Sequence, residues 1–119
     1  MSGQNATVLP LKDYRARRQT LYFCRSELNQ LLGLYSRNVA RGIWRDYAID
    51  HGDGQALFSV FRHTHETPAY SIVKSLPGPA QPEEFIVLSG RRRLRVARSI
   101  GEALDFFRAR ITLVPADPA

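Results

Sequence analysis

The chain has almost no cysteine, since Cys24 is the single one among 119 residues. One thiol excludes a disulfide within the chain and any zinc site that is built from several thiolates. Long apolar runs are also missing, whereas a membrane-spanning helix needs about 20 consecutive apolar residues. The N-terminus lacks an apolar segment long enough for a secretory signal. These absences predict a cytoplasmic protein without a membrane segment.

Lysine is scarce as well, because only Lys12 and Lys74 contribute to the 17 basic residues. The positive charge is therefore almost entirely guanidinium, and 17 basic against 11 acidic residues give a net charge of +6. One guanidinium group can donate two parallel hydrogen bonds to the oxygens of a phosphate or a carboxylate. With 44% hydrophobic and 24% charged residues, the composition is that of a globular protein. An arginine-rich globular domain points to an acidic or polyanionic partner.

The length allows one domain with a tail at each end. We expect a flexible basic arm at residues 1–20, a single domain at residues 21–112 and a frayed tail at residues 113–119. The arm has too little apolar area to fold alone. Its arginines, which can contact phosphate, are Arg15, Arg17 and Arg18.

Hydrophobic spacing predicts a helix at each end of the domain. Apolar residues recur every three or four positions over residues 26–41 and again over residues 100–110, as in an amphipathic helix. Ser26 is the expected N-cap of the first helix, and Ser99 with Glu102 forms a capping box for the second. The first apolar stripe comprises Leu28, Leu31, Leu32, Tyr35 and Val39.

Five strands are expected between the helices, separated by residues typical of turns. Their ranges are 44–50, 56–64, 69–76, 84–89 and 92–97. The predicted fold class is therefore α+β, in the order α-β-β-β-β-β-α, with a twisted antiparallel sheet packed with two helices. The predicted core comprises Leu31, Tyr35, Phe58, Val60, Leu104 and Phe107.

The central strands carry apolar residues at consecutive positions, as in the run Leu57 to Phe61. A strand with only one buried face alternates apolar and polar residues instead. Both faces of the sheet therefore need cover, and two helices are too few to provide it. We predict either a strongly curled sheet or an interface with a second subunit or another protein.

The chain resembles a small alphaproteobacterial family of uncharacterised proteins, classified as a domain of unknown function, at residues 35–50 and 57–62. The first of these segments contains the run Trp-Arg-Asp-Tyr-Ala-Ile-Asp. The similarity spans roughly residues 21–108 and continues through Thr64, Glu66, Pro68 and Tyr70. The resemblance implies a bacterial cytoplasmic protein of one domain. It assigns no catalytic residue and no cofactor.

The most unusual feature is a dense arginine segment that no acid interrupts: Arg91, Arg92, Arg93, Arg95 and Arg98. In an extended strand Leu94 and Val96 share one face, so we expect Arg93 and Arg95 to share the opposite one, about 7 Å apart. That separation approximates the phosphate spacing along one nucleic-acid strand. The alternative interpretation is an edge strand whose charges prevent aggregation.

Catalytic and metal motifs are weak. The candidate metal ligands are His51, His63, His65 and Glu66, but a metal site needs three or four ligands at a fixed geometry. Asp46 and Asp50 share one face of their strand, where pairing with Arg62 explains them more simply than catalysis. Cys24 is expected to be half-buried in packing. We therefore predict no enzyme activity, no metal and no cofactor.

The favoured function is non-enzymatic binding of an acidic or polyanionic partner, nucleic acid or a nucleoprotein assembly first among them. The arginine segment would contact phosphates, assisted by the arm, and replacing Arg93 and Arg95 with Glu should weaken this binding. The alternative is a protein-interaction or self-assembly module, a homodimer for example, that uses an exposed sheet face. Phosphate binding weakens steeply with salt and apolar association does not.

Overall fold

The computed structural model describes residues 20–63, 67–78 and 80–113, with side chains up to residue 108. The expected arm, apart from Thr20, and most of the expected C-terminal tail lie outside these residues. The elements are α2 (Arg25–Ala40), β1 (Asp46–Gly52), β2 (Gln55–Phe61), β3 (Tyr70–Ser75), β4 (Glu84–Ser89), β5 (Arg92–Ala97) and α3 (Ile100–Leu113). The predicted order of one helix, five strands and one helix is confirmed.

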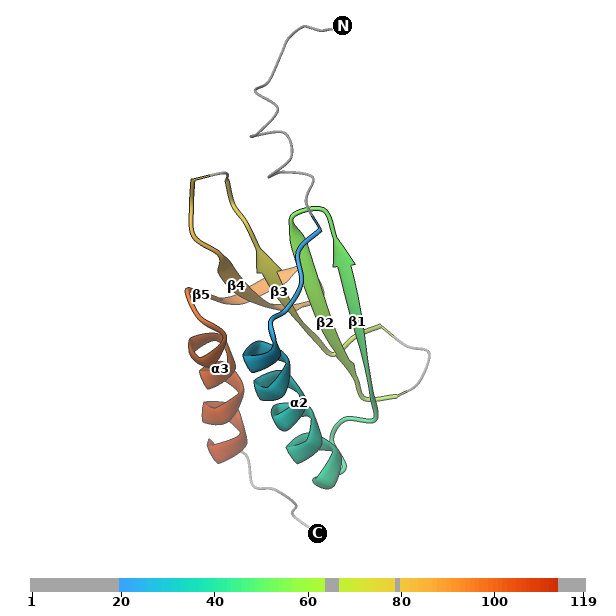
Figure 1. Cartoon of the computed structure of the whole chain (residues 1–119). Helices are drawn as coiled ribbons and strands as arrows, with labels where there is room; N and C mark the ends of the chain where they lie inside the picture. Colours follow the sequence, from blue (N-terminus) through green and yellow to red (C-terminus); the bar gives the residue numbers. More distant parts are fainter. Residues whose placement is uncertain (1–19, 64–66, 79, 114–119) are drawn as a thin grey trace, which may run out of the picture.

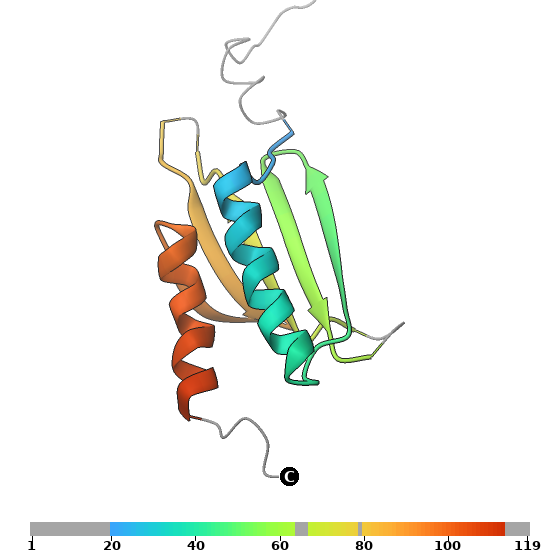
Figure 2. The same cartoon turned by 60° about the horizontal axis from the view of Figure 1, so that its bottom comes forward.

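The five strands form one antiparallel sheet in the order β1-β2-β3-β4-β5, so each strand pairs with its neighbour in sequence. Both helices lie on the same face of this sheet, α2 beside α3 (Figures 1 and 2). No other element of the described chain covers the opposite face. Of the described helices, none is long and apolar enough to cross a membrane.

The core lies between the helices and the sheet. Leu31 of α2, Phe58 of β2 and Leu104 of α3 are fully buried there, and Phe107 is only 4% exposed. Trp44 closes one end of the core by packing edge-on against Phe107, with ring centroids 5.7 Å apart. The predicted core is confirmed, except that Tyr35 is half-buried at its margin.

Helix α2 differs from its prediction at both ends. It begins at Arg25, and Cys24 rather than Ser26 is the N-cap, with the N–H of Cys24 donating to the Glu27 carboxylate at 2.8 Å. Cys24 is exposed, so the half-buried position expected for it was wrong. At the other end Val39 is exposed and Asn38 is buried in its place.

Asn38 is a buried polar residue in the last turn of α2, and its side-chain amide and its carbonyl are both hydrogen-bonded. Its side-chain amide donates to the Leu34 carbonyl at 2.9 Å, and its own carbonyl accepts hydrogen bonds from the N–H groups of Ile43 and Trp44. Gly42 follows with a φ of 75°, which suits glycine. This turn draws Trp44 into the core, so β1 begins two residues later than predicted.

A buried lysine joins three segments on the helix side of the sheet. Lys74 of β3 is 5% exposed, and its Nζ donates to the Tyr22 carbonyl and to Glu27 Oε1, each at 2.8 Å. Glu83 Oε2 lies 3.6 Å from the same nitrogen. Lys74 thus ties the start of α2 and the β3–β4 connection to the centre of the sheet, a role that the sequence pattern did not indicate.

Candidate polyanion interface

The arginine segment does not form a single stripe. In β5, Arg93 pairs with Leu88 and Arg95 pairs with Val87, so Leu94 is an extra residue that bulges out of the pairing. Leu88 and Val87 are consecutive in β4 and point to opposite faces. Arg93 and Arg95 therefore lie on opposite faces, and the prediction that they share one was wrong.

The bulge turns Arg95 towards α3. Its Nη1 donates to the Glu102 carbonyl at 2.9 Å, and the side chain is half-buried. Glu102 also caps the helix: its N–H donates to the Ser99 hydroxyl at 3.1 Å, as predicted, while its carboxylate accepts from the Arg98 N–H. The guanidinium of Arg95 thus links the helix to the sheet edge, on the opposite face of the sheet from Arg93.

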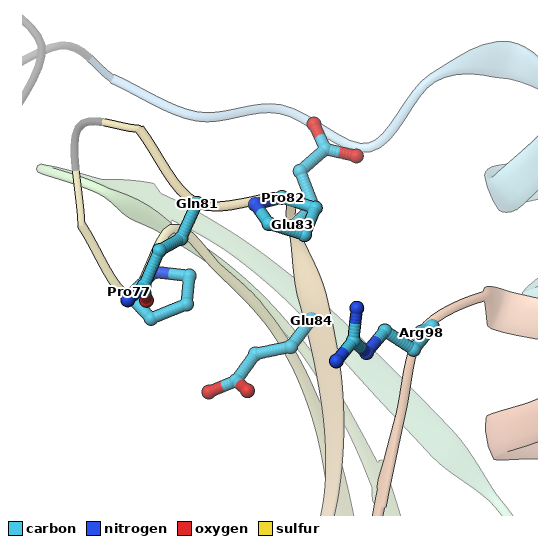
Figure 3. Close-up of a pocket in the computed structure, with 6 residues that line it drawn as sticks. All are labelled: Pro77, Gln81, Pro82, Glu83, Glu84 and Arg98. Atoms are coloured by element: carbon cyan, nitrogen blue, oxygen red, sulfur yellow. The ribbon is translucent and has the colours of Figure 1, made fainter.

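Arg98 lies at the opposite end of β5 from the β4–β5 turn, beside a pocket of about 310 Å³. The pocket is lined by Pro77, Gln81, Pro82, Glu83, Glu84 and Arg98. Figure 3 shows the guanidinium of Arg98 directed towards β4, near Glu84. The Glu84 carboxylate points away from this guanidinium in Figure 3, but the pocket lining still holds two carboxylates and one guanidinium. This balance of charge makes the pocket a poor site for an anion.

Arg91, Arg92 and Arg93 remain exposed at the β4–β5 turn. The turn is tight because Gly90 adopts a φ of 62°, which a glycine accommodates without strain. Ser89 anchors it by donating a hydrogen bond from its hydroxyl to the Ala69 carbonyl at 3.2 Å. The turn therefore lies beside the end of the β2–β3 connection.

Further arginines gather at this same end of the sheet. In a meander every second connection lies at the same end, so the α2–β1, β2–β3 and β4–β5 connections fall together (Figures 1 and 2). The Arg45 N–H donates to the Phe61 carbonyl at 2.8 Å, which joins two of them directly. The arginines of this end, called the basic end below, are Arg37, Arg41, Arg45, Arg62, Arg91, Arg92 and Arg93.

Charge is strongly polarised along the strands. Among the described residues of the basic end, Asp46 is the one acid beside seven arginines. The opposite end holds a cluster of carboxylates: Glu27, Asp53, Glu83, Glu84 and Glu102. Sequence reasoning found Arg91, Arg92 and Arg93 but missed the other four, because these arginines are separated along the chain. A signal was available, since the arginines recur in alternate connections.

Tyr35 and Tyr47 border the basic end, with ring centroids 4.8 Å apart. Partial burial raises the pKa of the Tyr35 hydroxyl above its ordinary value, and the negative charge of Asp46 and the neighbouring Tyr47 raise it further. The hydroxyl therefore stays protonated at neutral pH and adds no negative charge to the basic end.

The other predicted groups are not brought together. His65, Glu66 and the arm arginines Arg15, Arg17 and Arg18 lie outside the described residues. Within the described residues, no group of three or more potential metal ligands occurs. Asp46 pairs with Phe61 in the β1–β2 register rather than with Arg62.

A family model matches residues 21–94, which contain α2, the first four strands and the start of β5. The chain belongs to the family DUF2794, described as a protein of unknown function. This confirms the family resemblance, and the alphaproteobacterial origin stays a prediction. No curated protein matches the chain, and no solved structure matches it. In this DUF2794 protein the matched segment includes all seven arginines of the basic end.

Proposed function

We propose that this DUF2794 protein binds a polyanion, with a nucleic-acid backbone first among the candidates, through its basic end and without catalysis. The observation that carries the proposal is the concentration of seven arginines at one end of the sheet, beside a single acid among the residues that the structure describes there. Six of these seven are exposed, and Arg41 is half-buried. The sheet and its turns fix the backbone that carries these arginines, so binding phosphate costs less ordering of the main chain than it would on a free tail.

The chemistry favours recognition of a backbone over recognition of bases. Arginine contacts with phosphate position a nucleic acid and carry no sequence information. Tyr35 and Tyr47, which border this end, pack against each other, and Tyr47 also stacks on Phe58. These two rings therefore do not form a free platform for stacking bases. We therefore expect similar affinity for different sequences and a steep dependence on salt.

Replacing Arg91 and Arg92 with Glu should weaken binding to RNA or DNA of any sequence. The slope of log affinity against log salt should flatten by about 0.7 to 0.9 for each lost phosphate contact. Fluorescence anisotropy with a labelled oligonucleotide at several salt concentrations measures both effects. This pair replaces Arg93 and Arg95 as the first test, because Arg95 is held by the Glu102 carbonyl.

The matched control is the replacement of Arg25 and Arg98 with Glu. Both residues are exposed at the acidic end, and this pair changes the net charge by the same amount. If the control weakens binding as much as the test pair, only the overall charge matters and the basic end is not the site. Absence of binding by the wild-type protein at low salt would overturn the proposal.

A second candidate function is protein interaction or self-assembly. The uncovered face of the sheet favours it, because Val96 is 51% exposed there and lies in line with other aliphatic side chains. This function does not require Arg91 and Arg92, and salt should weaken its apolar contacts little.

A further inference from the structure

The sheet face away from the helices carries a continuous aliphatic row. Leu57 pairs with Val73, Val73 with Ile86, and Ile86 with Val96, so the four side chains lie side by side across β2 to β5. None of the four belongs to the core cluster beneath the helices. Below, this face is called the open face.

The central members of the row shield one another while the outer members remain accessible. Val73 and Ile86 are 9% and 8% exposed, Leu57 is half-buried and Val96 is 51% exposed. No element of the described chain lies over them (Figures 1 and 2). An apolar row that is accessible at both ends, and that no described element covers, favours an interaction site.

The two edges of the open face carry opposite charges. On β1, Tyr47 and Ile49 face the helices, so alternation puts Asp46 and Asp50 on the open face. On β5, Arg93 pairs with Leu88 and shares the open face with it. The aliphatic row is therefore flanked by two acids, Asp46 and Asp50, at the β1 edge and by Arg93 at the β5 edge.

We infer that a second copy of this chain covers the open face, related to the first by a two-fold axis that runs along β3. This axis places β1 of each copy over β5 of the other, so acids meet arginine at both edges. A two-fold axis perpendicular to the strands would place β1 over β1, with like charges opposed. Charge complementarity therefore selects both the occupant and the orientation.

Register makes the contact specific. Arg93 lies in the same cross-strand row as Ala48, between Asp46 and Asp50. Packed sheets cross at about 30°, which shifts facing edges by about 5 Å along the strands. Arg93 therefore reaches one of the two acids of the second copy in either direction of shift. The aliphatic rows of the two copies meet between these edges.

The dimer bears on the polyanion proposal. Because the axis runs along the strands, both basic ends emerge at the same end of the dimer and form one doubled surface. Arg93 is engaged at the interface, which leaves the other six arginines of the basic end, Arg91 and Arg92 among them, for phosphate. This doubling rests on the proposed function, whereas the dimer itself does not.

Sedimentation of the full chain without nucleic acid tests the dimer. The wild-type protein should be dimeric at micromolar concentration, and Val96→Glu should weaken the dimer about tenfold or more, because it sets a carboxylate against the acids of the facing β1 edge. Val39→Glu is the matched control, since Val39 is 42% exposed on α2 and should leave the dimer intact. Circular dichroism verifies that both variants fold.

A charge exchange tests the axis. The first variant carries Arg93→Glu, and the second carries both Asp46→Arg and Asp50→Arg. Each variant alone should fail to form the dimer, because like charges then face each other at both edges. Mixing the two variants should restore a dimer, because every edge of the mixed pair is again complementary. A monomeric wild-type protein, or a mixture that stays monomeric, overturns the inference. A wild-type protein that forms the dimer but shows no salt-dependent binding of an oligonucleotide overturns the polyanion proposal and leaves the dimer inference standing.

Discussion

Replacing Phe107 with alanine should lower the free energy of unfolding by about 3–5 kcal/mol. The ring is 4% exposed and lies at the centre of an aromatic cluster. Its centroid is 5.0 Å from that of Tyr70, 5.2 Å from that of Phe106 and 5.7 Å from that of Trp44, each in an edge-to-face arrangement. Truncation removes these contacts and leaves a cavity between α3 and the sheet, which surrounding side chains fill only in part.

Urea unfolding monitored by circular dichroism measures the loss. Phe106→Ala is the control on the same helix, because Phe106 is half-buried and should cost less than Phe107. Phe107→Leu should cost less again and provides a folded variant if the alanine variant does not fold. A loss below about 1 kcal/mol for Phe107→Ala would contradict its placement in the core.

Replacing Lys74 with alanine should destabilise the fold by about 3–5 kcal/mol, as expected when one partner of a buried ion pair is removed. Lys74 and Glu27 are 6% and 13% exposed at their side chains, and their charged atoms are 2.8 Å apart. Without the ammonium group, the Glu27 carboxylate loses its compensating charge and the Tyr22 carbonyl loses a donor. The start of α2 would then be less firmly held to β3.

A double-mutant cycle separates the pair from its surroundings. Lys74→Met keeps the apolar stem, and Glu27→Gln keeps an acceptor for the Cys24 N–H. The double variant should recover at least half of the loss caused by Lys74→Met, because neither charge is then left unpaired. Additive losses of the two single variants would contradict a direct interaction between Lys74 and Glu27.

The candidate site was predictable only in part. Local composition identified Arg91, Arg92 and Arg93, because consecutive arginines at a turn are exposed whatever the fold. Alternation misplaced Arg95, because a single bulged residue, Leu94, reverses the face of everything beyond it. The gathering of other arginines depends on which connections share an end of the sheet, and therefore on strand order.

The amino-acid sequence by itself determined the elements of this protein and their order. Helical spacing in α2 and α3, turn residues between strands and apolar runs in β2 and β4 are local patterns, and local backbone preferences act on them directly. The apolar character of both sheet faces could be predicted for the same reason, because consecutive apolar residues within one strand point to opposite faces.

Tertiary structure decided the rest. Both helices cover the same face, which leaves Leu57, Val73, Ile86 and Val96 on the other. The burial of Lys74 also depends on tertiary structure, because the partners of its charge are Tyr22, Glu27 and Glu83, which are distant in sequence or lie on another connection. Contacts between distant segments depend on register and packing, where one inserted residue or one choice of face changes every neighbour.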